Sequence, residues 1–270
     1  NQWTLASPSG KLAITLGLRA DEGSGGNTLR ACYRVEHGAE AARVEVLPWS
    51  PLGLVRSDQA FVDGLTLKGI GRVETIDEMY TLPHGKQSAC RSRARQQTIA
   101  LANASGAIVE IVLRAADDGV AFRYRFPDAA KGPVKIQREL TGFQFPADAK
   151  AWMAPYSEST KWTPAYEEYY LNAIASGTES PKKHGWAFPA LFHTRGRWVL
   201  VTEAANDGTY CGCRLASQAP GGLYRIRFPD PEEGWGQGDV QPSGKLPWAS
   251  WTIPWRVLIV ADSPAGIVES

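Results

Sequence analysis

The chain is poor in the residues on which thiol and metal chemistry depend. Its 270 residues include four cysteines, four histidines and two methionines. Cys211 and Cys213, which would point to one face of a strand, lack the second half of a zinc knuckle. Metal binding by these thiols is therefore disfavoured. Buried free thiols or one disulfide are expected instead, and Cys32 with Cys90 is the pair considered.

Long apolar runs and an excess of charge of one sign are also absent. No segment approaches the ~18 apolar residues that a membrane span requires. The 29 Lys and Arg residues against 28 Asp and Glu give a net charge of +1, so the chain has no electrostatic footprint for nucleic acid or an anionic membrane. The chain begins at Asn1 without an apolar leader. We interpret it as an exported, periplasmic protein whose signal peptide has been removed.

Signatures of nucleophilic and phosphate chemistry are missing too. No G-x-S-x-G elbow or phosphate-binding glycine loop is present. The histidines are scattered along the chain, and a lone loop histidine is more often a satisfied residue than a general base. Helical patterns are weak, with short candidates only at Ala165–Leu171 and Ser263–Glu269.

Short runs of alternating apolar residues, separated by turn residues, dominate the sequence. Such strands without intervening helices favour a sandwich or barrel, and no repeat or low-complexity linker divides the chain. We therefore predict an all-β fold in a single domain over residues 1–270. The predicted strands are Lys11–Leu18, Thr28–Val35, Arg43–Val46, Gln97–Leu101, Ile108–Arg114, Val120–Phe126, Val134–Leu140, Trp198–Glu203, Gly208–Leu215, Leu223–Phe228 and Trp251–Val260.

The ten tryptophans and nine tyrosines are many for this length. Most are expected in the core, and a few could line a sugar site. The irregular stretches Lys150–Gly185 and Pro229–Pro247 contain several of the tryptophans. Long loops with aromatic and acidic residues are where β-sandwiches usually carry function.

Seven segments, in order along nearly the whole chain, resemble the N-terminal domain of glycoside hydrolase family 97, a family of bacterial α-glucosidases and α-galactosidases. The D-G-V-A-F-R-Y and P-W-R-V motifs are the most specific. The segments are SPSGKLAITL (Ser7–Leu16), Tyr33–Leu54, RAADDGVAFRYRFP (Arg114–Pro127), Arg138–Pro146, YEEYY (Tyr166–Tyr170), Val199–Leu215 and WTIPWRVLIVADSPAGIVES (Trp251–Ser270).

The resemblance implies a large antiparallel β-super-sandwich of the galactose-mutarotase type. In the family this domain precedes a (β/α)₈ barrel that carries the catalytic carboxyl groups. The chain alone is therefore expected to be inactive, and its partner would be the barrel of its own parent enzyme. That parent would act on α-linked glucosides or galactosides.

The resemblance also implies a calcium ion at the active site, held by barrel glutamates and by one glutamate from the Tyr-Glu loop. By matching that motif, the ligand is Glu167, and Glu168 is the second choice. Calcium prefers six to eight oxygen ligands, so one glutamate cannot form the site alone. A surface glutamate in a tyrosine-rich loop is the alternative interpretation.

The remaining acidic residues are assigned simpler roles. Asp117-Asp118-Gly119 is predicted to be a hairpin turn in which glycine supplies a positive φ. Glu203 is expected to be a paired or edge carboxylate, and Glu232-Glu233 to lie in a solvated acidic loop.

Two other functions stay open at this stage. A free-standing sugar-binding or mutarotase-like epimerase domain would need a histidine and a glutamate that converge, for which His184 or His193 with Glu203 are candidates. A structural or interaction domain would present the tryptophan-rich loops as a partner surface.

Overall fold

The predicted all-β antiparallel sandwich is confirmed in the computed structural model of the chain. The structure describes residues 1–20, 28–85, 87–127, 134–158, 168–234, 243–244 and 251–270. Besides the strands it contains three short 3₁₀ turns, at Glu40–Ala42, Pro220–Gly222 and Pro231–Gly234, and the helix α1 (Pro264–Glu269). The Ser263 side chain caps α1 by accepting the Gly266 N–H at 3.3 Å, as expected at a helix N-terminus.

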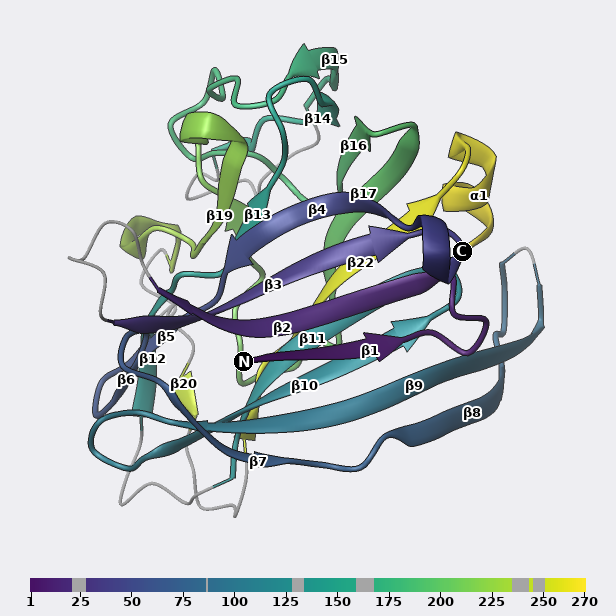
Figure 1. Ribbon diagram of the computed structural model, residues 1–270. Coiled ribbons are helices and arrows are strands. Elements are labelled where there is room, and N and C mark those ends of the chain that lie inside the picture. Colours follow the sequence, from purple (N-terminus) through teal and green to yellow (C-terminus); the bar gives the residue numbers. More distant parts are fainter. Residues whose placement is uncertain (21–27, 86, 128–133, 159–167, 235–242, 245–250) are drawn as a thin grey trace.

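Two sheets form the main sandwich. The first has the order β1 (Gln2–Ala6), β2 (Leu12–Ala20), β3 (Leu29–His37) and β4 (Val44–Pro51). The second is an 11-stranded sheet whose path is β15 (Leu171–Ala175), β14 (Lys150–Met153), β16 (Ala190–Thr194), β17 (Arg197–Ala204), β22 (Trp255–Ala261), β11 (Gly119–Phe126), β10 (Ile108–Ala116), β9 (Ala89–Ala102) and β7 (Thr66–Ile70). Off this path, β21 (Trp251–Thr252) pairs with β11, and β8 (Glu74–Thr81) pairs with β9. Figure 1 shows β1–β4 lying across one face of the large sheet.

Buried and half-buried side chains alternate strictly along β11, and this alternation explains how the two sheets pack together. Phe122 and Tyr124 are buried, whereas Ala121 and Arg123 lie on the opposite face and are only half-buried. Successive side chains of a strand point to opposite faces, so one set enters the core. The Phe122 ring lies 4.5 Å from the ring of Tyr33 on β3, which joins the first sheet to the second.

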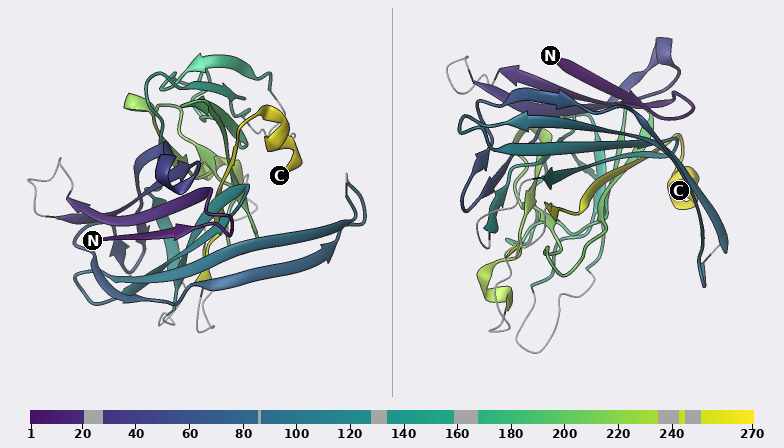
Figure 2. Two further views of the ribbon diagram at one scale, coloured as in Figure 1. Left: turned by 45° about the vertical axis from the view of Figure 1, so that its right-hand side comes forward. Right: turned by 90° about the horizontal axis from the view of Figure 1, so that it is seen from below.

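Two small sheets close the remaining sides. One has the order β20 (Ser243–Gly244), β12 (Val134–Glu139), β5 (Leu54–Arg56) and β6 (Ala60–Phe61), and the other β13 (Gly142–Gln144), β19 (Leu223–Arg227) and β18 (Arg214–Leu215). The β8–β9 hairpin projects beyond the neighbouring strands (Figure 2). Nearly all residues of β8 are exposed.

Most predicted strands are present, but the strand predicted over Gly208–Leu215 is wrong. Only Arg214–Leu215 forms a strand there. The preceding residues turn locally, because the Asp207 side chain accepts hydrogen bonds from the backbone N–H and the hydroxyl of Thr209 at 2.7 and 2.6 Å. The alternating apolar residues of this segment pack as a loop instead.

None of the four cysteines forms a disulfide, so the Cys32–Cys90 bridge is absent. Cys32 lies on β3 of the first sheet and Cys90 on β9 of the second. Cys211 and Cys213 lie outside strands. Cys213 is buried and its thiol contacts the backbone oxygen of Cys211 at 3.8 Å.

The predicted turn at Asp117-Asp118 joins β10 to β11, but the reason given for Gly119 is wrong. Gly119 has no positive φ. A Cβ atom at this position would lie 2.9 Å from the Leu258 backbone oxygen. Close approach of β22 therefore accounts for the glycine.

The helix candidate Ser263–Glu269 is confirmed by α1, whereas residues 165–167 of the other candidate lie outside the described residues and Leu171 begins β15. Within the described parts of the chain, no helix has the length and apolar character of a membrane span.

Candidate functional site

Glu167, the first choice for a calcium ligand, lies outside the described residues. Its neighbour Glu168 is described and half-buried, and its carboxylate accepts a hydrogen bond from the Lys182 ammonium at 3.0 Å. This bond lowers the pKa of Glu168. Tyr169 is 93% exposed. The described part of the Tyr-Glu loop therefore faces solvent, and a cation at Glu168 would have to displace Lys182.

Carboxylates that could serve glycoside hydrolysis are mostly engaged by other groups in the described structure. The Asp117 carboxylate accepts the backbone N–H of Ser9 at 2.8 Å. Glu158 lies 3.9 Å from the Lys183 ammonium. Glu139 and Glu203 are brought together, but the guanidinium of Arg256 binds both. Two glycosidase carboxyl groups must face a substrate from opposite sides, and a buried arginine occupies that position here.

The Arg256 network lies inside the sandwich at the start of β22. Its Nε donates to Glu139 Oε1 at 2.9 Å and its Nη1 to Glu203 Oε2 at 2.6 Å. The Tyr210 hydroxyl donates to Glu139 Oε2 at 2.8 Å. Arg256 and Glu139 are fully buried as side chains. Burial raises the pKa of Tyr210, which keeps its hydroxyl protonated as the donor. The network joins β12, β17 and β22 and confirms the paired role expected for Glu203.

A second charged cluster surrounds Arg214 on β18. This guanidinium is 1% exposed and binds Glu233 at 2.5 Å and Asp230 at 3.1 Å. The solvated loop predicted for Glu232-Glu233 is therefore wrong for Glu233, whose side chain is only 10% exposed because it neutralises a buried charge. His184 Nδ1 lies 2.8 Å from Asp230 Oδ2.

The ligand atoms of His184, Asp230 and Glu233 lie within 4.8 Å of one another, a geometry that could hold a metal ion. Arginine side chains already neutralise these carboxylates, however. Arg214 binds both carboxylates, and Arg227 also binds Asp230 at 2.7 Å. We therefore assign this cluster to the anchoring of the segment that follows β19.

Acid is expected to weaken this anchor. Burial opposes ionisation, but hydrogen bonds from Arg227 and His184 lower the pKa of Asp230, and those from Arg214 lower the pKa of Glu233. A lowered folded pKa gives stability that is present above the unfolded value, about 4, and lost as pH falls through the folded value. The urea midpoint should therefore fall on acidification below about pH 4, and less steeply in Glu233→Gln. If the urea midpoint fell equally steeply with pH in the unmodified chain and in Glu233→Gln, the assignment would be contradicted.

The epimerase alternative requires a histidine close to Glu203, and the described residues show none. His184 is held by Asp230. The His193 ring packs against Trp198, with centroids 4.8 Å apart. Glu203 is bound by Arg256, Asn206 and the Cys213 N–H. No general acid and base converge here.

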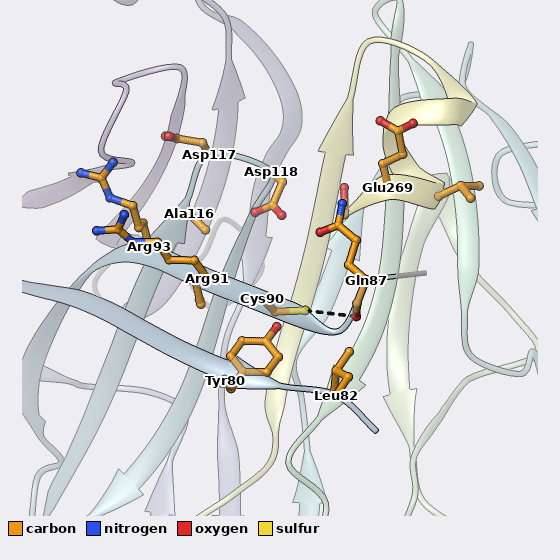
Figure 3. Close-up of a pocket in the computed structure, with 13 residues that line it drawn as sticks. Tyr80, Leu82, Gln87, Cys90, Arg91, Arg93, Ala116, Asp117, Asp118 and Glu269 are labelled. Atoms are coloured by element: carbon orange, nitrogen blue, oxygen red, sulfur yellow. Dashed lines mark hydrogen bonds between the residues drawn. The ribbon is translucent and has the colours of Figure 1, made fainter. Parts of the chain in front are cut away.

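An open pocket of about 1000 Å³ lies between the β8–β9 hairpin, the Asp117-Asp118 turn and α1. Figure 3 shows Tyr80 and Leu82 on one side and Arg91 with the two aspartates on the other. Tyr80 and Leu82 are 50% and 40% exposed, and Val268 of α1, which also lines the pocket, is 63% exposed. The pocket therefore combines exposed apolar side chains with mixed charges.

Sequence reasoning missed several residues that organise the structure. Arg214 carried no signal of its own, because a buried arginine is rare. Arg256 lies in the P-W-R motif, but its partner Glu139 is 117 positions away in the chain. The P-W-R and D-G-V-A-F-R-Y motifs did contain a usable signal. Arg114, Arg123 and Trp255 from these segments meet on the outer face of the large sheet.

Comparison with known proteins agrees with this architecture. The family model described as "Glycosyl-hydrolase 97 N-terminal" matches residues 5–270. A protein of Streptomyces bingchenggensis named probable retaining alpha-galactosidase is 31% identical over 268 residues, which is 99% of this chain and 37% of that protein. The chain thus spans little more than a third of the length of this curated relative.

Solved structures show the same fold. A beta-arabinopyranosidase structure superimposes with a TM-score of 0.85 at 33% identity, covering 96% of this chain and 40% of that one. A glycoside hydrolase family 97 enzyme from Pseudoalteromonas sp. strain K8 has a TM-score of 0.76 at 19% identity, covering 99% and 37%. From the match over residues 5–270, the chain belongs to the glycosyl-hydrolase 97 N-terminal family.

Proposed function

We propose that this chain is the non-catalytic N-terminal part of a longer, calcium-dependent α-glycosidase. The observation that carries the proposal is the family match over residues 5–270 in a chain that spans only 37% of a 31%-identical relative. The rest of such a protein would include the (β/α)₈ barrel with the catalytic carboxyl groups. Glu139 and Glu203 are paired with Arg256, which favours a non-catalytic role for this part.

For the longer protein we propose a sugar of the galactose or arabinose type. Two relatives above 30% identity are named as a probable retaining alpha-galactosidase and a beta-arabinopyranosidase. A retaining mechanism would place the two barrel carboxyl groups about 5 Å apart. We also propose that the longer protein is exported to the periplasm.

We propose that Glu167 joins barrel oxygens as a calcium ligand. The ion pair between Glu168 and Lys182 favours Glu167, because Glu168 already has a cationic partner. The described residues supply no second carboxylate to Glu168, so the remaining oxygens of a six- to eight-ligand shell would come from the barrel. When bound, the ion would stabilise developing charge and orient the substrate or a catalytic carboxyl group.

The surface that packs against the barrel is proposed to be the pocket end of the domain. Three exposed apolar side chains line the pocket there: Tyr80, Leu82 and Val268. Large exposed apolar patches mark interaction sites. No tryptophan of the described residues is among the exposed large apolar side chains, so in that part of the chain the tryptophan-rich loops do not form the partner surface.

Calcium binding separates the two glutamates. In the longer protein, Glu167→Gln is expected to weaken calcium affinity by about 10-fold or more, since a ligand charge is lost. Glu168→Gln, the matched control, should leave affinity within about 3-fold of the unmodified protein. Calorimetric titration measures both. Unchanged affinity in Glu167→Gln, or a larger loss in Glu168→Gln, would contradict the assignment.

A further inference from the structure

The outer face of the large sheet carries an arginine cluster that the proposed function does not use. Arg114 on β10 and Arg123 on β11 both place their guanidinium groups over the ring of Trp255 on β22, at 4.8 and 4.2 Å from its centroid. These strands are neighbours in the sheet, in the order β22, β11, β10. Arg123 and Trp255 belong to the two most specific sequence motifs, and Arg114 opens the segment that contains the first of these motifs.

The positive charges of this cluster are unequally paired. Arg125, two residues from Arg123 on the same face of β11, is bound by Glu110. Arg114 donates to the neutral amide oxygen of Gln96 at 2.8 and 3.1 Å. Within the described part of the chain, Arg123 has neither an ion-pair partner nor a hydrogen bond, and its Nε is buried without an acceptor. Among the described residues, Glu110 is therefore the one carboxylate bound to these three guanidinium groups, and it binds Arg125.

A half-buried guanidinium without an anion is unfavourable, because burial removes water that nothing replaces. Burial and the neighbouring Arg114 and Arg125 lower the pKa of Arg123, which reflects the same cost. Stacking on Trp255 uses the flat face of the guanidinium and leaves its edge free to donate. The planar fork of N–H groups on that edge matches the two oxygens of a carboxylate.

We propose that Arg123, with Arg114 and Trp255, forms a carboxylate-binding site on the outer face of the 11-stranded sheet. The ligand class is a carboxylate, which a sugar acid or an acidic side chain of another protein surface can supply. The carboxylate would accept from the Arg123 edge, while the ring of Trp255 keeps the guanidinium in place. This site shares no residue with the proposed calcium loop, and the proposal does not rest on calcium binding.

Arginine side-chain NMR on the ¹⁵N-labelled chain tests the site directly. D-glucuronate is expected to give a saturable shift of the Arg123 Nε–Hε resonance, whereas D-glucose, its neutral counterpart, gives none. In a second arm, N-acetylglutamate amide is compared with N-acetylglutamine amide. Tighter binding of glucuronate would identify a sugar acid as the source, and tighter binding of the glutamate derivative would identify a protein side chain. Either result supports a carboxylate site.

Substitutions test whether Arg123 is the residue that binds the carboxylate. Both carboxylates should raise the melting temperature of the chain by mass action, and Arg123→Gln should lose this rise. Arg123→Lys keeps the charge without the fork and should bind about 10-fold more weakly. Arg19→Gln is the matched control, since Arg19 also stacks on a tryptophan, Trp49, at 4.7 Å, but on the first sheet. Absence of a saturable Arg123 shift with both carboxylates would overturn the proposal, as would an equal loss of the rise in Arg19→Gln.

Discussion

Replacement of Arg256 by alanine is expected to destabilise the chain by about 3–5 kcal/mol. The guanidinium has no exposed surface and binds Glu139, whose side chain is equally buried. Without Arg256, the Glu139 charge would remain inside the sandwich with only the Tyr210 hydroxyl as a partner. The loss of stability would be measured as a lower midpoint of urea denaturation at neutral pH.

Two further variants separate the missing charge from the missing side-chain volume. Removing both fully buried partners, in Arg256→Met with Glu139→Leu, should recover part of the lost stability, because the buried Glu139 charge is gone and Glu203 keeps its hydrogen bonds from Asn206 and the Cys213 N–H. Arg91→Ala removes an exposed pair with Asp77 at 2.6 Å and should not change the midpoint measurably. A double variant no more stable than Arg256→Ala would contradict the proposed role of the ion pair.

Gly222→Ala is expected to cost about 2–5 kcal/mol, the sum of a left-handed backbone and steric overlap. Gly222 has φ +80°, and a Cβ atom there would lie 2.2 Å from the Phe145 backbone oxygen. The Gly222 oxygen also accepts the Phe145 N–H at 2.9 Å, so the two backbones cannot separate without losing that bond. The Phe145 ring stacks on Phe192 at 3.7 Å, which extends the disturbance into the core.

The neighbouring glycine provides the control for backbone strain alone. Gly221 has φ +63°, but a Cβ atom there has no neighbour within 4 Å. Gly221→Ala should therefore cost only about 1–2 kcal/mol. Urea denaturation of both variants measures the difference. Equal losses would show that the contact with Phe145 has no energetic consequence.

The sequence was most informative where one strand face is buried and the other is not. Strands such as β11, with its alternating Phe122 and Arg123, are visible because the period of two matches the pleat. The strands β14 to β16 were not predicted, because their pairing is set by distant neighbours rather than by local pattern.

The sites show a similar division. Family motifs indicated which segments matter, and the role of Glu203 as a paired carboxylate followed from its strand position. The partners of Arg214 and Arg256 could not be predicted, since Glu139 lies 117 positions from Arg256 and only the fold brings them together. Glu233 was misassigned for the same reason, because the composition of its loop gives no indication of a buried arginine beside it.

Hydrolysis by the purified 270-residue chain tests the central claim most directly. Glu139 and Glu203 are bound to Arg256, and the neighbouring carboxylates of Asp230 and Glu233 are bound to Arg214. With calcium present, we expect no release of p-nitrophenol from the α-galactoside or the α-glucoside above that of buffer. Turnover that co-elutes with the folded chain and persists after further purification would contradict the claim that this domain supports an active site without completing it.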